Sequence, residues 1–559
     1  MKKIFLLLCL CTVIVSCKTS TTDSVPSEKA VKKALEKANE EGRDTLSPLT
    51  LQVLDSKYIT KADVFSTLEN EVLAFSINSP NGTRKAELLN ELVQEKSIPE
   101  IQQAIYDGKF TYEDLALYYL NRIYKYDRNN DLSLNSVIAL NPNVLEQARA
   151  ADEQLQKLLG YGEVLDPYRI NGMPILLKDN INTADMPTTA GASVLLNNQT
   201  EDAQLVTNLK DAGAIILGKA NLSEWAYFFC GDCPSGYSAV GGQTLNPYKR
   251  KYFDTGGSSS GSGVSVAANF AVAAVGSETS GSILSPSSQN SIVGLKPTVG
   301  TISGKGVVPI SSYLDTAGPM AKNVTDTAIL LNAMRGDEAD VLEKELIPKL
   351  KDYELEGKRF GIFPDFKENP LYAEAIATIK NQRGIIVELP EKEIQLNGFL
   401  KLLYADMKKD LPTYFNADGN VAFKNWNVER VMIENRKDSL RAMPYGQKLF
   451  QGIIDEPEMT DEEFANFKKQ MTKTAQDYMN YYYSRYNLDG ILSINNYTAG
   501  IAAVGFYPAM TVPMGYDKDG KPFGLTFISP TGKDRELFGW AAAYERVSKK
   551  RKMPTNYQK

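Results

Sequence analysis

The chain of 559 residues contains no histidine. A Ser-His-Asp hydrolase requires a histidine as its general base, so the composition alone excludes that mechanism. Cysteine is also scarce, with five residues in the whole chain. The pair in "CGDC", Cys230 and Cys233, has neither a histidine nor a second cysteine pair that would complete a zinc site. We therefore expect no metal site.

The Cys230–Cys233 pair has two other readings. In an oxidising compartment two cysteines at this spacing favour a local disulfide, which closes only a short loop. Two free thiols in a loop are the alternative that the sequence leaves open.

Positive charge is limited as well. The formal net charge is -6, the calculated pI is about 5.3, and no long basic run or basic patch interleaved with aromatics occurs. A protein that binds the phosphate backbone needs such a patch, so we expect no nucleic-acid partner. With 43% hydrophobic and 23% charged residues, the chain has the composition of a soluble globular protein with a sizeable core.

Long hydrophobic runs are confined to the N-terminus. Two lysines precede an apolar run over residues 4–15, which is too short to span a bilayer but is typical of a signal peptide. The run ends in "IVSC", which resembles the bacterial lipobox. We therefore expect residues 1–16 to be a signal peptide and Cys17 to carry lipid, which places the body outside the cytoplasm, anchored to a bacterial membrane at the periplasmic face or cell surface. A secretory signal that is cleaved elsewhere is the alternative.

The remaining pattern predicts an α/β protein. Residues 17–96 predict a polar tether followed by a helical extension, residues 97–550 a main domain, and residues 551–559 a short tail. In the main domain, strand-like runs such as "GMPILL" and "AIILGKA" alternate with amphipathic helices such as "AQLVTNLKDAG". This alternation predicts a mixed, largely parallel central sheet flanked by helices. Residues of about 369–486 are mostly helical and more charged, and we interpret them as a helical insertion.

Two segments rich in glycine and serine stand out within the main domain. "GGSSSGSG" covers residues 256–263, and "GSETSGSILSP" begins at residue 276 and contains Ser282. The first segment formally matches the G-x-S-x-G nucleophile motif at Ser259, but no histidine exists to serve it. A neutral lysine can act as the base if its pKa is lowered by burial or by a nearby positive charge. Lys178, directly after "GMPILL", is a candidate, although it could also lie at an exposed strand end.

Three segments together, "GMPILLKDNI", "GGSSSGSGVSVAA" and "GSETSGSILSPSSQNSIVGLKPTVG", resemble the amidase signature family, and the resemblance covers roughly residues 97–550. It implies the fold of that family and a cofactor-free serine hydrolase with a Lys–Ser–Ser triad. Lys178 is then the base, Ser258 the bridging serine held by a cis peptide bond, and Ser282 the nucleophile. By position, the oxyanion hole is formed by the backbone N–H groups of Thr279, Ser280, Gly281 and Ser282.

Two positions depart from the family pattern. The family usually has glycine where Ser280 stands, and often arginine where Leu284 stands. The carboxylates of Glu278 and Asp315 could polarise the site or pair with Lys178, but we expect them to make structural hydrogen bonds.

The resemblance also bears on the substrate. "SAVGGQTLNPY" and "GGSSSGSG" are most similar to bacterial peptide amidases, which release ammonia from C-terminal peptide amides. The resemblance implies hydrolysis of a carboxamide, in a peptide amide or a small molecule, through a Ser282 acyl-enzyme. An esterase or aryl-acylamidase with the same triad, and a catalytically silent binding lipoprotein, are the alternatives.

Overall fold

The computed structural model describes residues 59–77, 80–128, 131–336 and 342–558. The predicted signal peptide (1–16), the lipidation site at Cys17 and most of the tether lie outside these residues. Within them, no helix combines the length and the apolar character that are needed to cross a membrane.

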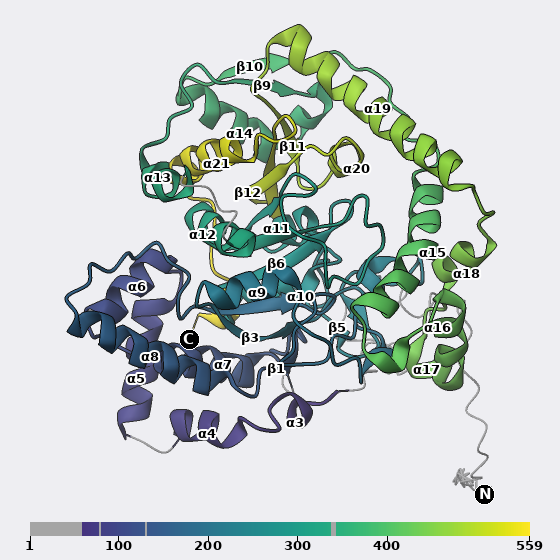
Figure 1. Ribbon diagram of the computed structural model, residues 1–559. Coiled ribbons are helices and arrows are strands. Elements are labelled where there is room, and N and C mark those ends of the chain that lie inside the picture. The colour runs from purple at the N-terminus through teal and green to yellow at the C-terminus, as the bar shows by residue number, and fades with distance from the viewer. Residues whose placement is uncertain (1–58, 78–79, 129–130, 337–341, 559) are drawn as a thin grey trace, which may run out of the picture.

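The N-terminal extension is helical where it is described. Its helices are followed by three that begin the main domain, and all of them gather at the lower left of Figure 1. The hydroxyl of Thr111 accepts a hydrogen bond from the amide of Asp114 and caps the helix that follows. The elements are α3 (Lys61–Val64), α4 (Glu69–Ile77), α5 (Pro80–Val93), α6 (Ile98–Tyr106), α7 (Tyr112–Tyr126) and α8 (Val144–Gly160).

Among the described residues, eleven strands form one central sheet in the order β1-β3-β2-β6-β8-β7-β12-β13-β11-β9-β10, and β4 (Tyr237–Ser238) and β5 (Gly242–Gln243) form a separate small hairpin. The strands of the large sheet are β1 (Val137–Leu140), β2 (Pro174–Lys178), β3 (Ile215–Ala220), β6 (Ala273–Glu278), β7 (Val293–Lys296), β8 (Thr316–Ala321), β9 (Arg359–Ile362), β10 (Ile385–Glu388), β11 (Gly490–Ile494), β12 (Ala509–Tyr516) and β13 (Pro522–Ile528).

The sheet mixes parallel and antiparallel pairs. The pairs β3–β2 and β2–β6 on one side, and β11–β9 and β9–β10 on the other, are parallel, while the strands between them pair antiparallel. Strands β2, β3 and β6 are buried along their whole length, which matches their continuous apolar sequences. The predicted mixed α/β fold with a large central sheet flanked by helices is confirmed.

Helices pack against the sheet and surround it. They are α9 (Gln204–Asp211), α10 (Ser260–Ala267), α11 (Leu284–Gln289), α12 (Val324–Arg335), α14 (Pro370–Asn381) and α21 (Asp534–Ser548). Two further helices pack on other helices: α13 (Leu342–Lys349) on α12, and α20 (Ala499–Val504) on α19 (Asp461–Tyr486). Helix α10 contacts β6 and α11, and both helices follow directly from the serine-rich segments of the sequence.

A layer of helices lies along one side of the sheet, at the right of Figure 1. It consists of α15 (Phe399–Ala417), α16 (Val428–Asn435), α17 (Ser439–Ala442), α18 (Lys448–Asp455) and α19 (Asp461–Tyr486), and we call residues 399–486 the helical cap. The predicted boundary of 369–486 is too early, because α14 packs on the sheet and β10 pairs in parallel with β9. The β-branched run "IIV" makes a strand too short to stand out among helical neighbours in the sequence.

The helical cap is fixed to the sheet by its own apolar cluster. The ring of Phe450 in α18 lies 5.4 Å from Trp225 and 5.0 Å from Phe229, and Phe228 lies 5.6 Å from Tyr404 in α15. The residues around position 225–229 follow β3, so the cap closes over the end of the sheet at which Lys178 is found.

Candidate active site

Lys178 is the last residue of β2, which pairs with β3 on one side and β6 on the other, and its side chain is fully buried. Its amine lies 2.7 Å from the Oγ of Ser258, 2.9 Å from the Oγ of Ser277 and 3.1 Å from the carbonyl oxygen of Ser277. A lysine is rarely fully buried unless it has such partners. The alternative of an exposed strand end is therefore wrong.

Burial lowers the pKa of Lys178 to about 7, against the smaller opposing effects of the carboxylates of Asp315 and Glu278. Near neutral pH a large fraction of the amine is therefore uncharged. A neutral amine has two N–H groups and one lone pair, but three oxygens surround this one. Because the carbonyl of Ser277 only accepts, one of the two neighbouring hydroxyls, Ser258 or Ser277, donates its proton towards the lone pair.

Ser258 lies between the lysine and the second serine segment. The Gly257–Ser258 peptide bond is cis, the carbonyl oxygen of Ser258 accepts a hydrogen bond of 3.0 Å from the amide of Ser223, and its side chain is fully buried. The amide of the next residue, Ser259, donates to the carbonyl oxygen of Ser282 at 3.1 Å. The backbone thus joins the two serine-rich segments directly. The Ser259 hydroxyl donates to the carbonyl of Ser277, so Ser259 has a structural partner.

Ser282 belongs to a tight turn between β6 and α11. Gly281 adopts a φ of +86°, which favours glycine, and a Cβ there would lie 2.9 Å from the side-chain amide of Asn496. The carboxylate of Glu278 accepts hydrogen bonds from the amides of Ile283 and Leu284, at 2.7 and 3.0 Å. These bonds hold the turn on both sides of Ser282, which is 9% exposed.

The turn also presents free backbone donors. Within the described part of the chain, no backbone carbonyl accepts a hydrogen bond from the N–H groups of Thr279, Ser280, Gly281 or Ser282. Thr279 donates its hydroxyl to Asp315, whose other oxygen accepts the amides of Ile310 and Ser311 at 2.8 and 3.0 Å. Glu278 and Asp315 therefore both make the structural hydrogen bonds that the sequence led us to expect.

The two departures from the family pattern have different surroundings. Leu284 is 1% exposed and belongs to an apolar cluster with Ala499, Tyr507 and residues of α19. Ser280 is half-buried, and its Oγ faces Gly500 in α20. Leucine is accommodated at position 284 because its neighbours are themselves apolar.

Cys230 and Cys233 are joined by a disulfide, with their Cα atoms 5.9 Å apart. The loop that contains them contacts α18 of the helical cap, where the amide of Leu449 donates to the carbonyl of Phe229 at 2.9 Å. The disulfide loop is therefore part of the contact between the cap and the sheet.

Sequence reasoning missed Ser277 and Asn180. The side-chain amide of Asn180 donates to the Oγ of Ser277 at 2.9 Å, and that oxygen also contacts Lys178. Both residues lie inside motifs that the sequence singled out, Asn180 in "GMPILLKDNI" and Ser277 in "GSETSGSILSP". Ser277 and Asn180 are in contact because β2 and β6 are neighbours in the sheet, and the sequence does not indicate which strands are neighbours.

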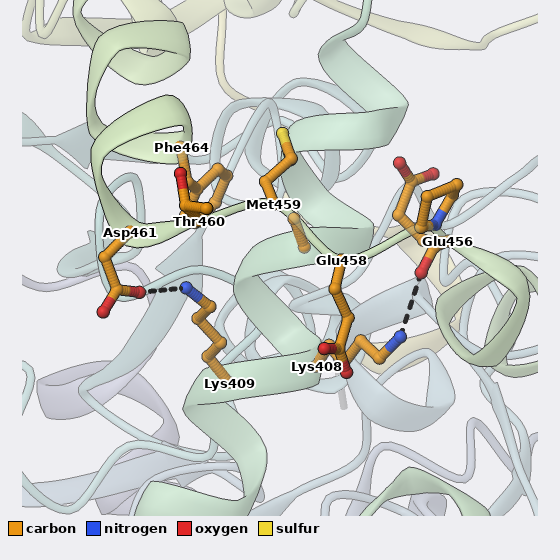
Figure 2. Close-up of a pocket in the computed structure, with 10 residues that line it drawn as sticks. Lys408, Lys409, Glu456, Glu458, Met459, Thr460, Asp461 and Phe464 are labelled. Atoms are coloured by element: carbon orange, nitrogen blue, oxygen red, sulfur yellow. Dashed lines mark hydrogen bonds and ion pairs between the residues drawn. The ribbon is translucent and has the colours of Figure 1, made fainter.

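A separate hollow of about 430 Å³ lies in the helical cap, between α15 and the segment that leads into α19 (Figure 2). An ion pair of 2.6 Å between Lys409 and Asp461 crosses it, and Lys408 donates to the carbonyl oxygen of Glu456 at 2.9 Å. None of the serine or lysine residues described above lines this hollow.

A buried lysine of lowered pKa that contacts one serine, with a second serine on the adjoining segment, is the arrangement of serine hydrolases that use lysine in place of histidine. Comparison with known proteins agrees with this class. Residues 114–383 match the family model described as Amidase. A protein from Arabidopsis thaliana that is named a probable amidase is 34% identical over 504 residues, which cover 87% of this chain and 96% of the relative.

Two solved structures are also similar. An amidase family protein from Bacillus anthracis has a TM-score of 0.80 and 35% identity, over 89% of this chain and 98% of that one. A peptide amidase from Stenotrophomonas maltophilia has a TM-score of 0.74 and 34% identity, over 82% of this chain and 98% of that one. The chain belongs to the amidase signature family and is a hydrolase that acts on carbon–nitrogen bonds.

Proposed function

We propose that this protein hydrolyses a carboxamide, in a C-terminal peptide amide or a small amide, through an acyl-enzyme on Ser282. The observation that carries the proposal is the 2.7 Å contact between the buried amine of Lys178 and the hydroxyl of Ser258. A buried neutral lysine can accept a proton near pH 7, which is the task that histidine performs in other serine hydrolases.

The acylation step follows from this contact. Neutral Lys178 accepts the proton of Ser258 while the oxygen of Ser258 accepts the proton of Ser282. The Oγ of Ser282 then forms a bond to the amide carbonyl carbon. When the tetrahedral intermediate collapses, the carbon–nitrogen bond breaks and the relay runs in reverse, so that the departing nitrogen receives a proton and leaves as ammonia or an amine. A water molecule, activated by the same groups, then attacks the acyl-enzyme, releases the carboxylic acid and restores the hydroxyl of Ser282.

The negative charge of the tetrahedral intermediate requires donors that are already in place. The free N–H groups of residues 279–282 suit this role because they have no backbone acceptor in the described chain. The bonds from Glu278 to the amides of Ile283 and Leu284 keep the turn in shape without occupying those donors.

The choice of a peptide amide is supported by the similarity to the Stenotrophomonas enzyme, which is named a peptide amidase. We further propose, from the N-terminal sequence, that Cys17 is lipidated and that the domain works outside the cytoplasm at a membrane surface. Mass spectrometry of the protein from bacterial membranes tests that placement.

The test of activity uses a mature protein that begins at residue 18. We expect a fluorophosphonate to label Ser282 once per chain, and ammonia to be released from an amidated dipeptide. Ser282→Ala should lose both properties and remain folded by circular dichroism. A folded wild-type protein that is neither labelled nor releases ammonia from a panel of peptide and small amides would contradict the proposal.

A further inference from the structure

The β6–β8 ladder places Asp315 beside the turn that contains the free donors of residues 279–282. Glu278 of β6 pairs with Thr316 of β8, so Thr279 and Asp315 are opposite each other just beyond the end of the ladder. Their side chains meet there, and the hydroxyl of Thr279 donates to the carboxylate of Asp315. The position of the turn at residues 279–282 is thereby tied to the position of Asp315.

Asp315 is in turn held by the loop before it. We call residues 310–315 the clamp loop. The second oxygen of Asp315 accepts the amides of Ile310 and Ser311, so the loop folds back around its own last residue. The hydroxyl of Ser311 also accepts from the amide of Leu314 at 3.2 Å.

Helices α15 and α19 of the cap hold three consecutive residues of the clamp loop. The fully buried hydroxyl of Ser311 donates to Asp406 of α15, and the amide of Ser312 donates to Asp410 one turn further on, at 2.6 Å. The hydroxyl of Tyr313 lies 2.8 Å from that of Thr472 in α19. The cap therefore contacts the clamp loop through side chains of both its long helices.

Asp406 is the centre of this contact. It is 1% exposed, and it forms an ion pair with Lys468 of α19 in addition to its bond from Ser311. The amine of Lys468 lies 5.0 Å from the centre of the Tyr313 ring. A buried carboxylate requires such partners, and here one of them belongs to the loop that positions the turn at residues 279–282.

We propose that Asp406 and Ser311 are positioning residues for the oxyanion hole, and that the helical cap thereby acts on turnover. This inference rests on the proposed function of residues 279–282. The path is continuous in hydrogen bonds: Asp406 to Ser311, Ser311 to Asp315, and Asp315 to Thr279. Loss of the first bond removes one of the three contacts that hold the clamp loop to the cap, the one that leads directly to Asp315, and lets the donors shift.

Two variants and a matched control test the proposal. Ser311→Ala removes the bond to Asp406 but leaves the ion pair with Lys468, so the two cap helices stay joined. Asp406→Asn keeps an acceptor for Ser311 but removes the charge that faces Lys468. The control, Lys409→Gln, removes an ion pair between the same two helices that is exposed and does not reach the clamp loop (Figure 2).

We expect Ser311→Ala to lower the maximal rate of labelling by a fluorophosphonate, and kcat for an amidated dipeptide, by about tenfold or more, with KM within about twofold. Asp406→Asn should lower both rates by a smaller factor, and Lys409→Gln should leave them unchanged. Hydrogen–deuterium exchange of residues 276–289 should be faster in Ser311→Ala than in Lys409→Gln.

The proposal is contradicted if Ser311→Ala is labelled by the fluorophosphonate, and exchanges its amide hydrogens, at the same rates as Lys409→Gln. It is also contradicted if Ser311→Ala changes KM alone and leaves kcat unchanged. Failure of the proposed function gives a different result, because the wild-type protein itself would then not be labelled. In that case the exchange of residues 276–289 still decides whether the cap holds the turn.

Discussion

The amine of Lys178 and the hydroxyl of Ser258 lie 2.7 Å apart, and both side chains are fully buried. Because burial lowers the pKa of Lys178 from its ordinary value of 10.5 to about 7, the amine is charged below pH 7 and neutral above it. Only the neutral form accepts a proton. We therefore expect the labelling rate of Ser282 to fall about tenfold per pH unit below pH 7 and to level off above it.

This pH dependence is measured with a fluorophosphonate from pH 5 to 9. A rate that levels off only near pH 10 would mean that Lys178 has an ordinary pKa. A flat profile with full activity at pH 5 would remove the lysine from the mechanism.

Two serines of "GGSSSGSG", Ser258 and Ser262, should differ in their effect on kcat. Ser258→Ala breaks the proposed relay and should lower kcat on the order of a thousandfold. Ser262→Ala is the matched control, because the Ser262 hydroxyl is equally buried but donates to the carbonyl of Val275, at 3.1 Å. The kcat of both variants is measured from the steady-state release of ammonia from an amidated dipeptide. Equal losses in the two variants would show that the segment needs its serines for folding alone.

Leu284 should not tolerate the arginine that the family often has at this position. Its side chain is 1% exposed among apolar neighbours, so Leu284→Arg buries an unpaired charge and should destabilise the protein on the order of 4 kcal/mol. Leu400→Arg is the control, since Leu400 is 47% exposed, and the change should cost within about 0.5 kcal/mol. Urea midpoints compare the two. A stable Leu284→Arg protein would mean that the site around Ser282 has room and a partner for a cation.

The disulfide between Cys230 and Cys233 should stabilise the protein only slightly. Its ends are three residues apart, so it removes little chain entropy, and Cys230→Ser/Cys233→Ser should lower the free energy of unfolding by about 2 kcal/mol at most. Thermal unfolding of the wild type with and without reductant gives the same comparison. A much larger loss, together with a raised KM, would show that the disulfide also shapes the substrate site through α18.

Much of the fold could be predicted because its pattern is local. The runs "GMPILL", "AIILGKA" and "VAAVGS" became β2, β3 and β6, since a buried strand needs only a short apolar sequence between turns. The start of α7 at Thr111 was predictable because a cap and its partner are three residues apart.

The remainder could not be predicted because it depends on distant segments meeting. Ser277 reaches Lys178 only because β2 and β6 are neighbours, and Asp406 reaches Ser311 across 95 positions of sequence. Strand β10 was taken for part of the helical insertion because four residues at the edge of a sheet leave no periodic pattern. The positions of Lys178, Ser258 and Ser282 were suggested by motif resemblance, and their distances required the folded chain.

The register of β6 against β8 sets a limit on how this domain can be altered. Side chains alternate faces along a strand, so one residue inserted into β8 shifts the register by one, and Asp315 turns away from Thr279 if the rest of β8 keeps its pairing with β6. The hairpin between β12 and β13 has no such dependence, because Gly520 lies in an open turn there. Gly520 is therefore a suitable position for inserting a tag or for opening the chain in a circular permutant. The number of residues between positions 273 and 321 should be left unchanged.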